Sequence, residues 1–135
     1  MPEATVETPT AEALLPDELL RAASAEAYRM SGPDLVQHLK RYLGRPLIAH
    51  VTKTADANTV SRWATAKASP DRATWERLRT LGTVHLAVTR IVGSAESAGQ
   101  WLTGVNPDLG RMPADELREG NVGNVFAAVR LLAQQ

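Results

Sequence analysis

The residues best suited to chemistry lie between Leu47 and Pro70, where polar and basic side chains surround two short apolar segments. In the major groove of DNA, Asn can pair with adenine and Arg with guanine, while Ser or Thr can contact a base or a phosphate. The side chains expected to reach bases are Asn58, Thr59, Ser61 and Arg62. The flanking cations expected to hold phosphates, which positions a protein without reading sequence, are Arg45, Lys53 and Lys67.

Other kinds of chemistry find little support in the chain. It has no cysteine, so thiolate nucleophiles, disulfides and cysteine-based zinc sites are excluded. None of the three histidines, His38, His50 and His85, has a second ligand at metal-binding spacing, and nothing in the sequence places an acid beside a base. There is no glycine-rich phosphate loop and no Gly-x-Ser-x-Gly motif. We therefore expect no catalytic residues, no metal and no cofactor.

Charge supports a polyanionic partner for the middle of the chain. Fifteen basic and fifteen acidic residues cancel overall, but the net charge is −5 over residues 1–28, +7 over 29–90 and −2 over 91–135. A basic centre between acidic ends is typical of a nucleic-acid-binding region, although an ordinary solvated surface can have the same composition.

Apolar residues at helical spacing, together with Pro, Gly and acidic residues at segment ends, predict a chain of short helices. The expected helices cover residues 16–30, 33–43, 45–51, 59–66, 71–92, 113–117 and 125–132. Residues 93–99 are expected to form a loop or a short helix, and residues 120–124 a loop. No stretch alternates long enough for a strand, so the fold class is all-α.

The segment from about residue 46 to 68 is interpreted as a helix-turn-helix, in which the second helix enters the major groove. Val60 and Trp63 lie three residues apart and are expected to face inward together. The alternative is a plain helical core whose polar face contacts nothing. We divide the chain into a flexible acidic tail (1–15), a helical DNA-binding domain (16–93) and a second small helical domain (94–135).

The chain has no apolar run long enough for a membrane span. Its first residues, from Met1 to Glu7, are acidic and lack the apolar stretch of a signal peptide. With the absence of cysteine, these features predict a cytoplasmic protein with no membrane partner.

Two sets of residues resemble the Xre-type antitoxins of the MbcA/ParS group. The first is Val60-Ser61-Arg62-Trp63 with Pro70 after it, within the expected helix-turn-helix. The second is a series that resembles the toxin-binding domain of that family: Trp101-Leu102, Asn106-Pro107, Leu109-Gly110, Pro113 to Leu117, and Gly120. The resemblance covers about residues 34–135.

This resemblance implies a function. Such antitoxins bind a RES-domain toxin, which consumes NAD, cover its active site, and repress their own operon through the helix-turn-helix at operator DNA. The residues expected to contact the toxin are the polar ones of the last segments: Arg111, Arg118, Asn121, Asn124, Arg130, Gln134 and Gln135. Within the same region, Trp101 and Leu102 are expected in the core, while Gly110 and Gly120 are expected to supply positive φ or close approach.

The sequence departs from the family pattern in the turn and after the recognition helix. The turn is one residue longer than usual, Lys53 stands where Gly is common, and Ala66 stands where many relatives have Gly. Two alternative functions follow. One is a stand-alone transcriptional regulator, of a host or a phage, whose C-terminal domain only oligomerises. The other is an adaptor that keeps the partner-binding domain without DNA binding.

A dimer, or a larger hetero-oligomer with the toxin, is expected because single helix-turn-helix units bury little surface and operators usually match two-fold proteins. Residues 71–92 are the candidate for a dimer helix or an inter-domain strut.

Overall fold

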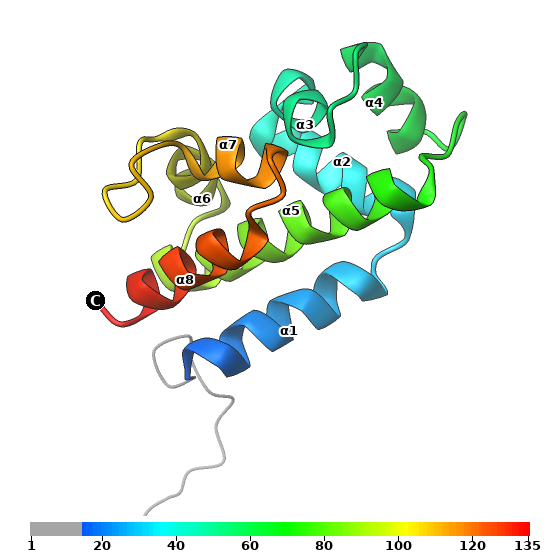
Figure 1. The fold of residues 1–135 in the computed structure, drawn as a ribbon. Helices are drawn as coiled ribbons and strands as arrows, with labels where there is room; N and C mark the ends of the chain where they lie inside the picture. The colour runs from blue at the N-terminus through cyan, green and yellow to red at the C-terminus, as the bar shows by residue number, and fades with distance from the viewer. Residues whose placement is uncertain (1–14) are drawn as a thin grey trace, which may run out of the picture.

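The computed structural model describes residues 15–135, and over this range the chain forms eight helices and no β-strand (Figure 1). The helices are α1 (Pro16–Arg29), α2 (Gly32–Leu43), α3 (Arg45–Thr52), α4 (Ala57–Ala64), α5 (Arg72–Val92), α6 (Ala95–Thr103), α7 (Pro113–Arg118) and α8 (Val122–Ala133). The expected all-α class is confirmed. The predicted tail, residues 1–15, lies outside the described residues except for Leu15.

Polar side chains cap the start of several helices. The side chains of Ser31, Asp71 and Ser94 each accept a hydrogen bond from a backbone N–H in the first turn of α2, α5 and α6. Such caps satisfy donors that have no partner within the helix. α5 ends at Gly93, whose φ of 83° is a left-handed conformation that glycine adopts at little cost. These signals fix the helix bounds close to the predicted ones.

Helix α5 is the centre of the fold. Its residues from Leu81 to Val88 are all buried, because α1, α2, α3, α6 and α8 pack around it. In Figure 1, α1 runs along one side of α5, while α2, α3 and α4 cover one end and α6, α7 and α8 the other. This middle part of α5 is therefore enclosed by its own chain and offers no surface to a second copy.

A single hydrophobic cluster continues through the described residues on both sides of Gly93. Leu102 of α6 and Val129 of α8 belong to the same cluster as Leu19 of α1 and Val60 of α4. Besides packing on α5, α6 contacts α2, α7 contacts α3, and α8 contacts α1. The predicted boundary between residues 93 and 94 thus falls at the turn between two helices that share one core.

Two helix starts were predicted too late. Helix α8 begins at Val122, not at residue 125, and the predicted loop 120–124 is correspondingly shorter. Val122 packs against the core, which favours an earlier start despite the neighbouring Gly123. Helix α4 begins at Ala57, two residues before its predicted start at Thr59. It starts there because the Asp56 carboxylate caps the helix by accepting a hydrogen bond from the Asn58 N–H. No helix of residues 15–135 is both long enough and apolar enough to cross a membrane.

Candidate functional site

Helices α3 and α4 are joined by residues 53–56, and the ends of both helices are well defined. Lys53 ends α3 in the left-handed conformation, with φ 60° and ψ 36°, and the Thr54 N–H donates to the Ala49 carbonyl at 2.9 Å. Asp56 then caps α4. The turn therefore closes with standard helix-ending and helix-starting geometry.

One side of α4 is fixed in the core. Val60, Trp63 and Ala64 are buried, so the predicted inward face of Val60 and Trp63 is confirmed. The Gln37 side chain of α2 donates from Nε2 to the Ala64 carbonyl at 3.1 Å. Packing on α2 and α3 holds α4 in place and turns its other side to the solvent.

The solvent side of α4 brings together five of the seven predicted DNA-contacting residues. Arg45, at the start of α3, donates from Nη1 to Asn58 Oδ1 at 3.1 Å and to Ser61 Oγ at 3.4 Å. Arg62 donates from Nη2 to Thr59 Oγ1 at 3.1 Å. We call these five residues, Arg45, Asn58, Thr59, Ser61 and Arg62, the α4 cluster.

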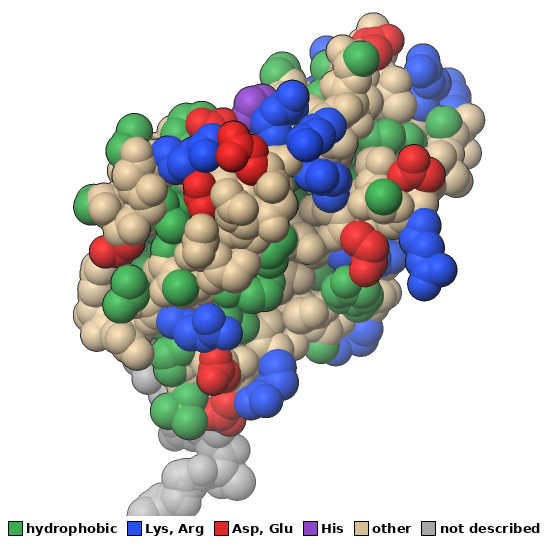
Figure 2. Space-filling view, in the orientation of Figure 1, with side chains coloured by type: hydrophobic (Ala, Val, Ile, Leu, Met, Phe, Trp, Pro, Cys, Tyr) green, Lys and Arg blue, Asp and Glu red, His purple; other side chains and the backbone are tan. Residues whose placement is uncertain are grey.

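The surroundings of the α4 cluster are basic. Lys53 and Lys67, the remaining two predicted residues, are both exposed, one in the turn before α4 and one just after it. Among the ion pairs within residues 15–135, none uses Arg45 or Arg62. Figure 2 shows Lys and Arg side chains over the end of the molecule formed by α3, α4 and the start of α5, with a few acidic ones among them. This end can thus offer unneutralised cations to an anionic partner.

The two positions at which the resembled family commonly has glycine adopt an unusual backbone conformation in this chain. Lys53 and Ala66, with φ of 60° and 61°, are the only non-glycine residues in the described range with positive φ. Both positions therefore adopt the conformation for which glycine is the preferred residue, although the side chains present make it costly. The turn geometry persists without the glycines.

A second polar cluster joins the C-terminal end of α3 to α7. His50 Nε2 lies 2.7 Å from Asp115 Oδ1, and Arg118 donates from Nη1 to the His50 carbonyl at 2.5 Å. Arg77 of α5 donates from Nη1 to the carbonyls of Val51, at 3.3 Å, and Arg118, at 3.1 Å. The His50–Asp115 pair corrects the expectation that no acid lies beside a base: the two residues are distant in sequence and meet only by folding.

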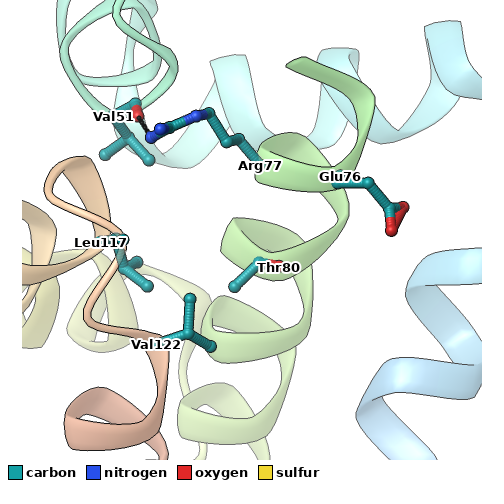
Figure 3. Close-up of a pocket in the computed structure, with 7 residues that line it drawn as sticks. Val51, Glu76, Arg77, Thr80, Leu117 and Val122 are labelled. Atoms are coloured by element: carbon teal, nitrogen blue, oxygen red, sulfur yellow. Dashed lines mark hydrogen bonds between the residues drawn. The ribbon is translucent and has the colours of Figure 1, made fainter. Parts of the chain in front are cut away.

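This second cluster borders a pocket of about 210 Å³ between α3, α5, α7 and the start of α8 (Figure 3). Val51, Leu117 and Val122 point into it, with Thr80 on the α5 side and the Arg77 guanidinium turned toward the Val51 carbonyl. No hydroxyl within residues 15–135 hydrogen-bonds the His50 ring. The two arginines of the cluster, Arg118 and Arg77, satisfy the carbonyls of His50 and Val51 at the end of α3.

Most of the predicted toxin-contacting residues already have partners in their own chain. Arg111 donates to both carboxylate oxygens of Glu119, at 3.1 and 3.0 Å, and these bonds lower the pKa of the Glu119 carboxyl. The Asn124 amide donates to Glu116, and Arg130 pairs with Asp17 of α1 at 2.7 Å. Arg118 is held against α3 as described. Of the seven predicted residues, Asn121, Gln134 and Gln135 are exposed and have no side-chain bond of this kind within residues 15–135.

Sequence reasoning missed a groove at the C-terminal end that is lined by both apolar and polar residues. A pocket of about 460 Å³ lies between α8 and the segment after α6 and includes Trp101, Val105, Pro107 and Leu132 in its lining. Val105 is 73% exposed. Trp101 was expected in the core and is only partly buried, whereas Leu102 is fully buried as predicted. No periodic signal marks Val105, because it lies between helices.

The turns between α6 and α8 follow the predicted chemistry. Gly110 and Gly120 have φ of 74° and 83°, which confirms the expectation of positive φ at both. Pro113 is the first residue of α7, as its fixed φ favours. In the segment between α6 and α7, the Asn106 N–H donates to the Arg111 carbonyl at 3.0 Å and closes a loop over residues 106–111.

Two further histidines meet inside the fold. His38 Nε2 lies 3.3 Å from His85 Nδ1, and His85 Nε2 lies 3.0 Å from the Ala95 carbonyl. Burial lowers the pKa of both rings. The carbonyl requires the proton of His85 on Nε2, so Nδ1 accepts from His38. No group of three or more metal-ligating side chains occurs within the described residues, so this pair is a hydrogen-bonded part of the core.

Comparison of the chain with protein-family models, curated proteins and solved structures finds no match in any of the three.

Proposed function

We propose that this protein is a cytoplasmic antitoxin that binds operator DNA through α4 and a RES-domain toxin through its C-terminal region. The observation that carries the DNA-binding half is the α4 cluster: four polar or cationic side chains on the exposed side of α4, whose other side is buried, joined by Arg45 from the start of α3. A rigid helix with polar side chains near its N-terminus is what major-groove recognition requires.

The charge around α4 supports the same proposal. Lys53 and Lys67 flank the helix and are exposed, so they can hold phosphates on either side of a groove. Arg45 and Arg62 have no acidic partner within the described residues that DNA would have to displace. Repression follows if two copies, or a complex with the toxin, occupy the operator together.

The toxin-binding half rests on the motif series from Trp101 to Gly120 and on the C-terminal groove. Val105, which is 73% exposed, and the partly buried Trp101 both line this groove, and Leu131 of α8, outside its lining, is 46% exposed. Exposed apolar side chains next to an aromatic anchor are typical of the centre of a protein interface. In the proposal this surface docks on the toxin, and the polar end of α8, with Gln134 and Gln135, reaches toward its NAD-binding cleft.

The first experiment is to purify the tagged full chain from its native cells at moderate salt and to identify any stoichiometric partner by mass spectrometry. A co-purifying RES-type protein that consumes NAD only after this chain is removed supports the antitoxin role. Recovery of the chain alone, or with DNA only, contradicts it.

The second experiment separates the two surfaces. Arg62→Ala is expected to weaken binding to the operator by about 1–3 kcal/mol, the range for a base-reading Arg, while Arg29→Ala, at an exposed arginine of α1, serves as a matched control. An unchanged mobility-shift titration for Arg62→Ala would remove Arg62 from the interface.

For the toxin, Val105→Asp is expected to abolish inhibition of NAD consumption without loss of the fold, because the side chain is exposed. Deletion of residues 121–135 is a poorer test, since it also removes the buried Val125 and Val129. Val92→Asp, at another exposed apolar residue away from the groove, is the control.

A stand-alone regulator is the second candidate, and one observation favours it. Arg111, Arg118 and Arg130 are bonded within the chain, which is what a C-terminal region that serves only the fold and oligomerisation would need. Tight and specific DNA binding without any stoichiometric protein partner would select this function over the antitoxin.

A further inference from the structure

The α4 cluster has a consistent polarity. A guanidinium has only donors, so the atom of the Asn58 amide that faces Arg45 must be the acceptor Oδ1. For the same reason Ser61 and Thr59 accept, through their hydroxyl oxygens, from Arg45 and Arg62. Three acceptors of the cluster are thus turned toward its own two arginines.

The groups left for a partner are mostly donors, because each of the three acceptor oxygens keeps only one lone pair, beside the arginine that occupies the other. The Asn58 amide keeps both N–H bonds of Nδ2, the hydroxyls of Thr59 and Ser61 keep their hydrogens, and each arginine keeps N–H groups that these bonds do not use. Asn58 and Ser61 lie three residues apart and share one side of α4, so the donors of Arg45, Asn58 and Ser61 are adjacent.

The four bases differ in what they offer to such a surface: cytosine presents an amino donor, and thymine a single acceptor, O4, beside its methyl group. Guanine presents two acceptors, N7 and O6, in the major groove, whereas adenine presents one acceptor and the N6 amino donor. A donor surface pairs with both guanine atoms but leaves the adenine amino group without a partner, and an unpaired polar group in a closed interface is costly. A free Asn, by contrast, can accept from N6 and donate to N7 of adenine.

We propose that α4 selects guanine at the position facing Asn58, and that Arg45 determines this choice by occupying one lone pair of the Asn58 oxygen and placing its cation beside the other, where an amino donor would have to approach. The inference rests on the proposed DNA binding and deepens it. It also replaces the simple expectation that Asn58 reads adenine. Arg45 contributes its own remaining donors to the same base and positions the Asn58 amide.

The test is selection of bound sequences from a random 20-base-pair duplex library with the full-length protein. The unaltered chain is expected to enrich a site with guanine at one position. Arg45→Ala is expected to enrich adenine at that same position, because the released Asn58 oxygen can then accept from N6. Asn58→Ala is expected to lose preference there without a change to adenine. Arg29→Ala, on α1, is the control and keeps the guanine.

A second measurement tests the acceptor directly. Replacement of that guanine by 7-deazaguanine removes N7 and is expected to weaken binding by the unaltered chain about tenfold, within the range for one specific base contact. Circular dichroism checks that each variant is folded. The switch from guanine to adenine expected for Arg45→Ala is a result that a merely structural role of Arg45 would not produce.

The outcomes separate the inference from the function on which it rests. The inference is overturned, with DNA binding left intact, if the unaltered chain enriches adenine at this position. The same holds if Arg45→Ala enriches the same base there as the unaltered chain. Failure to enrich any sequence overturns both.

Discussion

Exchange of Ala66 for glycine should stabilise the protein, although the exchange of alanine for glycine inside a helix normally destabilises a protein. Ala66 follows α4 with φ 61°, and its N–H donates to the Trp63 carbonyl at 3.2 Å. A left-handed conformation costs a residue with a Cβ about 1–2 kcal/mol. Glycine removes this cost but loses about 0.5–1 kcal/mol more chain entropy on folding. The expected net gain is about 0.5–1 kcal/mol.

The matched control is Ala25→Gly. Ala25 is an exposed residue in the interior of α1, where glycine is expected to cost about 1 kcal/mol. The two substitutions remove the same methyl group, so their difference isolates the backbone conformation. For a chain of 135 residues, 1 kcal/mol corresponds to about 3–4 °C in Tm.

The assay is urea unfolding followed by circular dichroism, with thermal unfolding as a second measure. The midpoint should rise for Ala66→Gly and fall for Ala25→Gly, at unchanged slope. Equal losses for both variants would mean that Ala66 does not hold the left-handed conformation in solution. The turn that follows the proposed recognition helix would then differ from the one described.

Three further predictions concern the core. Gly32→Ala should lower the free energy of unfolding by about 1–3 kcal/mol, measured in urea, because the new Cβ would lie 1.9 Å from the Trp75 ring. Burial lowers the pKa of His85 below 6.5, so the unfolded chain binds more protons at this residue than the folded one. The free energy of unfolding should therefore be full above about pH 6.5 and fall as the pH drops below that value, and His85→Gln should reduce this pH dependence. In a variant that keeps only Trp63, and in one that keeps only Trp101, the urea midpoint by fluorescence should equal the midpoint of the same variant by circular dichroism; a fluorescence midpoint that differs from it would indicate independent domains.

The sequence carried enough information to predict seven of the eight helices within residues 15–135 and the exposed side of α4, while α6 had been left open as a loop or a short helix. Local rules act within a few residues: Pro or a capping side chain starts a helix, Gly ends it, and apolar spacing selects the inward face. Val60 and Trp63 followed these rules. Helix α8 departed from them because packing of Val122 on the core outweighs the loop character of its neighbours.

Pairs that are distant in sequence could not be predicted in this way. His50 and Asp115 are 65 residues apart, and Arg118 reaches the carbonyl of His50 across 68. Spacing says which side of a helix faces inward, but it does not say which helix lies opposite. The exposed Val105 was missed for a related reason: it lies between helices, where periodicity gives no signal.

Helix α3 explains why the two halves of the sequence form one unit. Its first residue, Arg45, hydrogen-bonds α4 in the proposed DNA surface, while its last turn is bonded to α7 through His50 and to α5 and α7 through Val51 and Arg77. A helix of eight residues spans only about 12 Å, so both contacts act on one short rigid element. The C-terminal region therefore helps to hold the element that positions Asn58, and the difference in charge between the halves marks two surfaces on one core.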